Sequence, residues 1–271
     1  MKYKLIAVDM DGTLLKPDKT VDKNTISDIK MATENGADVV YCTGRSIDEL
    51  TMYFDILPMM KYAVCCSGAI IYDCIERKVI HREYIKKPYI EKIVGIADNY
   101  RAMSHFLEEK ASVIAKKDVV QMEIFGMAEY KPMFMEITRK VDSMAQEAKK
   151  YDAMPKIDLY FRSYEERKSA YEELKDLPLT FAYGVNPAIE ITAENVTKAT
   201  GLLKLLKILR ISQNQTIGIG DGDNDKEMLK IVGFPIAMDN AEDEIKRLAK
   251  YITSDNSNNG VGRAIRHIMN I

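Results

Sequence analysis

The stretch VDMDGTLL at residues 8–15 places two aspartates, Asp9 and Asp11, directly after the apolar run at 5–8. Residues two apart in an extended chain share a face, so these carboxylates would repel each other unless a cation or a shared chemical task holds them together. A surface turn is the simpler alternative, because Asp-Gly is a common turn dipeptide. The rest of the chain has to decide between these two interpretations.

The composition is ordinary for a soluble globular protein. The 271 residues are 46% hydrophobic and 30% charged, which suits one large domain or two of medium size. The formal net charge of −2 gives no field that would favour nucleic acid or an anionic membrane as a partner. The first apolar stretch ends at Asp9, too early for a signal peptide or a spanning helix. The four cysteines show no CxxC and no zinc-type spacing, so we expect a reducing, cytoplasmic location.

Short apolar runs alternate with helical patterns near both ends of the chain. The runs are continuous rather than alternating, which is typical of parallel strands buried on both faces. This pattern predicts an α/β fold with a doubly wound, mainly parallel (Rossmann-like) sheet. We expect its strands at 5–8, 37–42, 63–66, 188–191, 216–220 and 235–238, and its helices at 24–35, from 46, at 196–210, after 225 and at 261–270.

The pattern of predicted helices and strands changes between residues 86 and 184. Amphipathic helices rich in Lys and Glu, predicted at 141–154 and 163–176, lie among alternating strands at 156–163 and 179–184. This mixture predicts an inserted α+β cap domain. The expected boundaries are 1–85 for the first core segment, 86–184 for the cap and 185–271 for the second core segment.

Polar groups follow four of the expected core strands. In open parallel sheets, ligands bind at the carboxyl ends of the strands, so these groups are expected to meet at one edge. A turn at Asp11-Gly12 would account for only one of the four places and is the weaker interpretation. The groups are Asp9 and Asp11, then Thr43-Gly44-Arg45, then Ser67-Gly68-Ala69, and finally DGDND at 221–225.

Clustered carboxylates without a matching basic run indicate a bound cation, and oxygen ligands with no nearby His or Cys suit Mg²⁺. The DGDND segment is not an EF-hand loop, because the required glycine falls on Lys226 and the closing glutamate on Val232. It is not a dinucleotide fingerprint either, because that motif needs glycine at Asp223. Lys198, at the start of a predicted helix, would offset carboxylate repulsion and hold an anionic substrate. These residue types together suit phosphoryl transfer.

The motifs resemble those of the haloacid dehalogenase-like hydrolase superfamily, in particular its Cof-type phosphatases. DMDGTLL is similar to the first family motif, Thr43 in CTGR to the second, Lys198 to the third and GDGDND to the fourth. The segments PIAMDNA and SDNSNNGVGRAI are also similar to this subfamily, and the insertion falls where the family has its larger cap. One departure is Ser67, where the subfamily usually has asparagine in an Asn-Gly-Ala sequence.

The resemblance implies a Mg²⁺-dependent phosphatase that hydrolyses small phosphorylated metabolites, such as sugar phosphates, through an aspartyl-phosphate. Asp9 would be the nucleophile, and Asp11 the general acid and then the general base. Asp223 falls on a variable position of the motif and is expected to be solvated. The implied metal site consists of Asp9, Asp11 through its backbone carbonyl, Asp221 and a supporting Asp225, and the implied phosphate-binding residues are Thr43, Gly44, Lys198 and Asn224.

Two other functions remain open. A phosphomutase of the same superfamily would return the phosphoryl group to a sugar, and the cap would decide between the two reactions. A signalling receiver also combines acids, threonine, lysine and Mg²⁺ around a phosphorylated aspartate. Against a receiver, the presumed acceptor Asp9 lies on the first strand, Asp11 follows two residues later, and a large insertion is present. The sequence indicates neither the substrate nor the oligomeric state.

Overall fold

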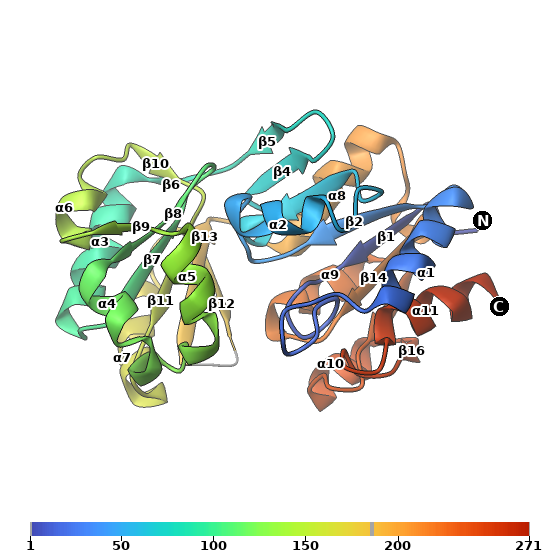
Figure 1. Ribbon diagram of the computed structural model, residues 1–271. Helices are drawn as coiled ribbons and strands as arrows, with labels where there is room; N and C mark the ends of the chain where they lie inside the picture. Colours follow the sequence, from blue (N-terminus) through green and yellow to red (C-terminus); the bar gives the residue numbers. More distant parts are fainter. Residues whose placement is uncertain (1, 185–186, 271) are drawn as a thin grey trace. The chain divides into compact units, whose positions relative to one another are not determined.

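The computed structural model describes residues 2–184 and 187–270. The chain forms two compact units, each with its own sheet (Figure 1). The first unit consists of Met1–Gly44, Thr51–His81 and Thr197–Ile271, and the second of Arg45–Leu50 and Arg82–Val196.

The first unit contains an eight-stranded sheet in the order β16-β15-β14-β1-β2-β3-β4-β5. Neighbouring strands run parallel from β16 to β3, and β4 is antiparallel to β3. The predicted α/β fold with a mainly parallel sheet is therefore confirmed. The strands are β1 (Leu5–Val8), β2 (Asp38–Cys42), β3 (Tyr62–Cys65), β4 (Ile70–Asp73), β5 (Lys78–Arg82), β14 (Thr216–Gly220), β15 (Phe234–Ala237) and β16 (Tyr251–Ile252).

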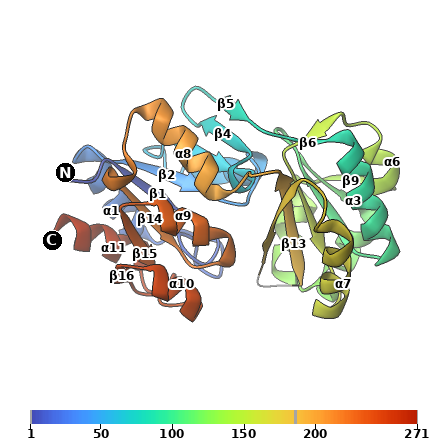
Figure 2. The same ribbon diagram turned by 180° about the vertical axis from the view of Figure 1, so that it is seen from behind.

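Helices cover both faces of this sheet, which explains why its central strands are continuous apolar runs. All four side chains of β1 are buried, as expected for a strand covered on both faces. Helices α1 and α11 pack against each other over one face (Figure 1), and α8 and α9 lie over the other (Figure 2). The helices of this unit are α1 (Lys23–Glu34), α2 (Thr51–Phe54), α8 (Lys198–Leu209), α9 (Lys226–Ile231), α10 (Asp243–Leu248) and α11 (Gly260–Met269), with 3₁₀ turns η2 (Cys66–Gly68), η5 (Gln213–Gln215) and η6 (Asp223–Asp225).

The second unit contains a six-stranded sheet in the order β12-β13-β11-β7-β8-β9, beside a two-stranded β10-β6 pair. Its strand pairs are antiparallel except for β8 with β9. The strands are β6 (Ile85–Lys86), β7 (Met103–Leu107), β8 (Ser112–Ala115), β9 (Arg139–Val141), β10 (Ala153–Met154), β11 (Lys156–Tyr160), β12 (Leu179–Tyr183) and β13 (Ala188–Ala193).

The two faces of the six-stranded sheet are covered differently. One face and helices α3, α6 and α7 share an apolar core that includes Phe106, Ile157 and Ile191. The other face meets a smaller apolar cluster, which includes Met122 and Phe134 and comes from the short helices between β8 and β9. The elements are α3 (Lys87–Asn99), α4 (Lys116–Val120), α5 (Lys131–Ile137), α6 (Met144–Ala148) and α7 (Tyr164–Leu174), with 3₁₀ turns η1 (Asp48–Leu50), η3 (Met122–Phe125) and η4 (Ala128–Tyr130).

The strand expected at 188–191 does not belong to the parallel sheet. Strand β13 pairs antiparallel with β11 and β12 in the second unit. Its apolar Ile189 and Ile191 alternate with Glu190 and Thr192, which is the pattern of a strand with one apolar face. The second unit therefore extends to Val196, beyond the expected boundary at 184, begins at Arg82 rather than 86, and also includes 45–50.

Two expected helices are shorter than their sequence patterns indicated. Only Met144–Ala148 is helical within 141–154, because strands β9 and β10 take the flanking residues. The helix expected from residue 46 begins as the 3₁₀ turn η1 and continues as α2. Within the described residues, no helix has the length and apolar character needed to cross a membrane.

Candidate active site

Four neighbouring parallel strands, β14, β1, β2 and β3, end at the same edge of the sheet. Asp9 follows β1 directly, and its backbone N–H donates to the carbonyl of Ile219 at 3.0 Å, which continues the ladder to β14. Gly12 then turns the chain with φ of +78°, and a Cβ there would lie 2.2 Å from Oδ2 of Asp221. Glycine therefore permits the turn after the first motif to approach the loop after β14.

Lys198 joins two of the predicted acids in the interior of the first unit. Its Nζ lies 2.5 Å from Oδ1 of Asp9 and 2.8 Å from Oδ1 of Asp225. All three side chains are buried, with exposed fractions of 7% or less. The structure thus brings Lys198 into contact with Asp9, which lies 189 positions away in the sequence.

Asp225 holds the acidic loop in its folded form. Its Oδ2 accepts hydrogen bonds from the backbone N–H groups of Asp221 at 3.0 Å and Gly222 at 3.1 Å. Gly220 allows this close turn, because a Cβ at that residue would lie 2.5 Å from Cγ of Asp225. Both oxygens of Asp225 thus have protein donors, and the residue fixes Lys198 and Asp221 in place.

Lys198 is positioned by tight packing at the start of α8. The side chain of Thr197 caps the helix by accepting from the N–H of Thr200 at 3.2 Å. A Cβ on Gly68 would lie 2.0 Å from the carbonyl oxygen of Thr197, and one on Gly201 would lie 2.7 Å from Cα of Gly68. The turn after β3 therefore packs directly against the first turn of α8.

We expect that Gly201→Ala displaces this first turn. The new methyl group would lie 2.7 Å from both the Gly68 backbone and Cγ1 of Val64, so the helix or the turn has to move. Overpacking of this kind costs about 1–3 kcal/mol of unfolding free energy. Because Lys198 lies three residues away, kcat on p-nitrophenyl phosphate should fall as well. Chemical denaturation and steady-state kinetics measure the two effects.

Gly95→Ala is the matched control, because it also lies in a helix and no atom lies within 4 Å of its added methyl group. We expect this control to be neutral or stabilising by up to about 1 kcal/mol. If Gly201→Ala behaved like Gly95→Ala, the tight packing would not position Lys198.

The acids carry more negative charge than their lysine neutralises. Burial, together with the neighbouring Asp225, raises the pKa of Asp9 well above its ordinary value in spite of Lys198. Burial and Asp225 likewise raise the pKa of Asp221 to about 7. Burial alone would lower the pKa of Lys198, but Asp225 and Asp9 raise it well above its ordinary value. The ionised forms of Asp9 and Asp221 are therefore destabilised unless further positive charge is present.

These residues fit a hard divalent cation. Asp9, Asp221 and Asp225 each offer one carboxylate oxygen, and the three oxygens lie within 4.8 Å of one another. A cation bound there would neutralise the excess charge that raises the pKa values of Asp9 and Asp221. The donor set is all oxygen, as Mg²⁺ and similar ions prefer.

The other predicted residues lie at the same edge of the sheet. Thr43 follows β2 and is buried; its N–H donates to Val64 and its carbonyl accepts from the N–H of Ser67 at 3.0 Å. Gly44 follows it, and Asn224 lies in η6. Asp11 is half-buried, and its Oδ1 lies 3.2 Å from Nζ of Lys19.

Three further residues contribute to the site and were absent from the predicted set. Thr13 donates through Oγ1 to Oδ1 of Asp221 at 2.6 Å, and Lys19 contacts Asp11. Asn240 donates to the carbonyl of Gly12 at 2.8 Å. Thr13 belongs to the DMDGT motif and Asn240 to PIAMDNA, so the motifs were the available signal for both. Nothing in the local sequence distinguishes Lys19 from any other loop lysine.

Three further charged residues have structural partners of their own. Arg45, which follows Thr43 and Gly44, is buried, and its guanidinium lies 3.6 Å from the sulfur of Met133. Arg162, which precedes α7, forms an ion pair with Glu166 in the first turn of that helix. Asp223 is partly exposed, as expected, and its carboxylate lies 2.5 Å from Nζ of Lys226.

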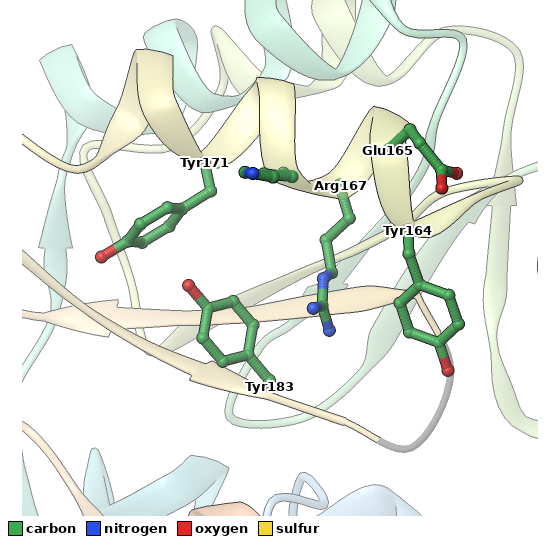
Figure 3. A pocket seen from close by; sticks show the side chains of 6 residues that line it. Tyr164, Glu165, Arg167, Tyr171 and Tyr183 are labelled. Carbon is green, nitrogen blue, oxygen red and sulfur yellow. The ribbon is translucent and has the colours of Figure 1, made fainter.

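A groove in the second unit, between α7 and β12, is lined by aromatic and charged side chains (Figure 3). Arg167 points between the rings of Tyr164 and Tyr183, with its guanidinium carbon 5.0 Å and 4.5 Å from their centroids. The ring of Tyr171 lies 5.7 Å from that of Tyr183. A cation of the protein itself thus already occupies the aromatic surface, and the groove has no acid cluster of the kind described above.

The parallel core and the buried acids at the ends of its central strands define an enzyme of the α/β class. The chain matches the family model of the haloacid dehalogenase-like hydrolases over residues 6–265 and belongs to this family. The enzyme is accordingly a hydrolase of the phosphatase class, as the first motif indicated.

Individual relatives agree with this assignment. The chain is 28% identical to phosphatase YwpJ of Bacillus subtilis, over 98% of this chain and 100% of the relative. It is also 28% identical to the 5-amino-6-(5-phospho-D-ribitylamino)uracil phosphatase YcsE of the same species, over 97% of this chain and 95% of the relative. The solved structure of a haloacid dehalogenase-like hydrolase from B. subtilis has the same fold, with a TM-score of 0.88, 24% identity and coverage of 98% of this chain and 99% of that one.

Proposed function

We propose that this enzyme is a Mg²⁺-dependent phosphatase of small phosphorylated metabolites and works through an aspartyl-phosphate on Asp9. The observation that carries the proposal is the contact of 2.5 Å between Asp9 and Lys198, beside the carboxylates of Asp221 and Asp225. A relative that is named for a phosphorylated ribityl compound supports a small polyhydroxylated phosphate as the substrate class.

Asp9 is assigned as the nucleophile. Its carboxylate is held through Oδ1 by Lys198, which restricts the directions in which it can point. Attack on phosphorus forms the bond between Asp9 and the phosphoryl group while the bond to the leaving oxygen breaks. Lys198 is assigned a second task, the stabilisation of phosphoryl oxygens together with Thr43, the Gly44 backbone and Asn224.

Asp11 is assigned the proton transfers. It donates a proton to the leaving oxygen in the first step, so the alcohol departs uncharged. In the second step the resulting carboxylate takes a proton from water, and the water oxygen attacks phosphorus. Inorganic phosphate then leaves, and the Asp9 carboxylate is restored. Lys19, whose ammonium lies 3.2 Å from Asp11, is placed to orient this side chain.

Mg²⁺ would be held by Asp9, Asp221 and the backbone carbonyl of Asp11, with Asp225 supporting the site. When bound, it supplies charge neutralisation and orientation for the phosphoryl group. Release of inorganic phosphate distinguishes a phosphatase from a phosphomutase, which would return the phosphoryl group to the sugar.

We expect phosphatase activity to depend on Mg²⁺. A chelator in excess should abolish turnover of p-nitrophenyl phosphate, and Mg²⁺ should restore it, because the buried acids need a hard cation. Asp221→Ala should also lose metal-dependent turnover while remaining folded by circular dichroism. Full activity in chelator, or recovery with Zn²⁺ alone, would contradict the assignment.

Thermal unfolding tests the binding of Mg²⁺ to the acids without a measurement of turnover. The folded pKa of Asp221 is raised from 3.8 to about 7, so the folded state binds its proton more tightly than the unfolded state does. The metal-free protein should therefore lose stability as the pH rises from about 4 to about 7. Mg²⁺ at one hundred times its dissociation constant should add about 2.7 kcal/mol to the unfolding free energy.

A further inference from the structure

Two asparagine side chains connect the loops after β15 and β16 to the turn that carries Asp11. Nδ2 of Asn240 donates to the carbonyl of Gly12 at 2.8 Å, and Nδ2 of Asn256 donates to the carbonyl of Leu15 at 2.7 Å. The backbone N–H of Asn256 donates to Oδ1 of Asn240 at 3.1 Å, so the three hydrogen bonds form one continuous chain. We call Asn240 and Asn256 the asparagine bridge.

The bridge spans the sheet edge inside the first unit. Strand β14 lies between β15 and β1 in the sheet, so the bridge joins loops that are not direct neighbours of the turn after β1. Asn240 uses both ends of its amide, since its nitrogen donates to the first motif and its oxygen accepts from the loop after β16. An amide side chain offers this combination of donor and acceptor, whereas a carboxylate offers acceptors alone.

The loops that carry the bridge are themselves held in place. The N–H of Met238 donates to the carbonyl of Gly220 at 3.1 Å, which ties the loop after β15 to the end of β14. After β16, the buried hydroxyl of Thr253 donates to the carbonyl of Gly260 at 2.6 Å. A Cβ on Gly260 would lie 2.1 Å from the carbonyl oxygen of Ser254, so this loop closes tightly. The bridge therefore has firm supports at its far end.

The bridge holds the backbone at two points that determine where the Asp11 side chain lies. Gly12 follows Asp11 directly. Leu15 precedes the loop at 16–20, which carries Lys19, and Nζ of Lys19 lies 3.2 Å from Oδ1 of Asp11. One contact of the bridge thus fixes the backbone beside Asp11, and the other fixes the start of the loop that supplies its cationic partner.

Stability alone does not account for the bridge. Both hydrogen bonds of the Asn240 side chain lie at the surface, where water can replace a lost partner at little net cost in free energy. Position is far more important for a group that transfers protons, because the transfer requires a heavy-atom distance of about 2.6–3.2 Å.

We propose that Asn240 and Asn256 are positioning residues, which hold the turn at 10–15 so that the carboxyl group of Asp11 reaches the leaving oxygen of the substrate. The inference rests on the proposed function, in which Asp11 protonates that oxygen. Without the bridge the turn would shift, whereas Asp9 would keep its place through Lys198 and the ladder to β14. Attack on phosphorus would then continue, and the proton transfer to the leaving oxygen would suffer.

The test compares two esters whose leaving groups differ in their need for a proton. Steady-state kcat/KM is measured on n-butyl phosphate, which releases an alkoxide, and on p-nitrophenyl phosphate, which releases a stable anion. The ratio of the butyl to the nitrophenyl value should fall at least about tenfold in Asn240→Ala and in Asn256→Ala, because a displacement of about 1 Å can cost about 10²-fold in rate. A merely structural loss would lower both values equally and leave the ratio unchanged.

Hydrogen exchange of the metal-free protein gives a second readout that needs no turnover. The backbone N–H of Leu14 donates to the carbonyl of Asp9 at 3.2 Å, and that of Leu15 donates to Met10 at 2.9 Å. Both amides should exchange with deuterated water faster in the two variants than in the wild type, because the turn opens more often once the bridge is lost.

Asn258→Ala is the matched control, because Asn258 lies in the same loop as Asn256 and its amide nitrogen donates to both carboxylate oxygens of Asp255, at 2.9 Å each. Its ratio and its exchange rates should equal those of the wild type. Equal losses on both esters, an unchanged ratio, or unchanged exchange in Asn240→Ala and Asn256→Ala would overturn the inference.

The Asp11→Asn variant, measured on the same two esters, separates this inference from the proposed function. A low ratio in Asp11→Asn with a wild-type ratio in both asparagine variants would leave the proposed function intact and remove the inference alone. A wild-type ratio in Asp11→Asn, or a wild-type enzyme that hydrolyses neither ester, would contradict the proposed function, and the inference would fail with it.

Discussion

Replacing Asp9 with asparagine should abolish phosphate release from every ester, and no phosphorylated protein should form. An amide has no carboxylate oxygen with which to attack phosphorus, so the first bond cannot be made. The variant should still fold, because Lys198 keeps its contact of 2.8 Å with Asp225. Removal of one charge also relieves the repulsion that, with burial, raises the pKa of Asp9. Phosphate release and mass spectrometry of protein incubated with substrate measure the result.

Asp223→Asn is the control for this experiment. Asp223 lies in the DGDND segment, is about one-third exposed, and pairs with Lys226 rather than with the buried lysine. We expect this variant to retain most of the wild-type rate. Turnover by Asp9→Asn, or an equal loss in both variants, would contradict the role of Asp9 as nucleophile.

The sequence was sufficient to predict the parallel core because its signals are local. Each central strand is an apolar run, and each is followed by acidic, hydroxyl or glycine residues. The sheet to which β13 belongs could not be predicted in this way. The alternation of Ile189 and Ile191 with polar residues indicates a strand with one apolar face, but it does not identify the neighbouring strands, which are β11 and β12.

The unit to which residues 45–50 belong could not be predicted from local patterns either. The helix start expected at residue 46 has a local basis, since the N–H of Ser46 donates to Oε2 of Glu49 at 2.9 Å. The hydrogen bond from the N–H of Ser112 to Asp48 at 2.7 Å depends on the tertiary fold. No local pattern could assign this segment to the second unit.

Within the candidate site, motif resemblance located the acids, but burial could not be inferred from it. The sequence of its own helix does not distinguish Lys198 from an exposed lysine. Its burial follows from the close approach of Gly68 and Gly201, which lie 133 positions apart and share no local pattern. The contact between Lys19 and Asp11 likewise depends on how the loop after β1 folds back.

Replacing Asp11 with asparagine should separate the two half-reactions. With an alkyl phosphate, the leaving alkoxide needs a proton, so the first step should stop. With p-nitrophenyl phosphate, the leaving group is stable as an anion, and the first step should be less impaired. The second step still needs a base to activate water, and asparagine cannot serve. General acid–base help of this kind is worth about 10²–10⁴-fold, enough for the phosphorylated enzyme to accumulate.

The Asp11→Asn variant should therefore release roughly one equivalent of nitrophenol per active site in a burst, as expected when one enzyme group is phosphorylated once. Turnover should then nearly stall. Rapid-mixing absorbance measures the burst, and peptide mapping should place a hydroxylamine-sensitive acyl phosphate on Asp9. Asp9→Asn is the control and should show no burst. A phosphate mapped to another residue, or steady turnover of alkyl phosphates by Asp11→Asn, would show that the two carboxylates of the first motif do not divide the reaction in this way.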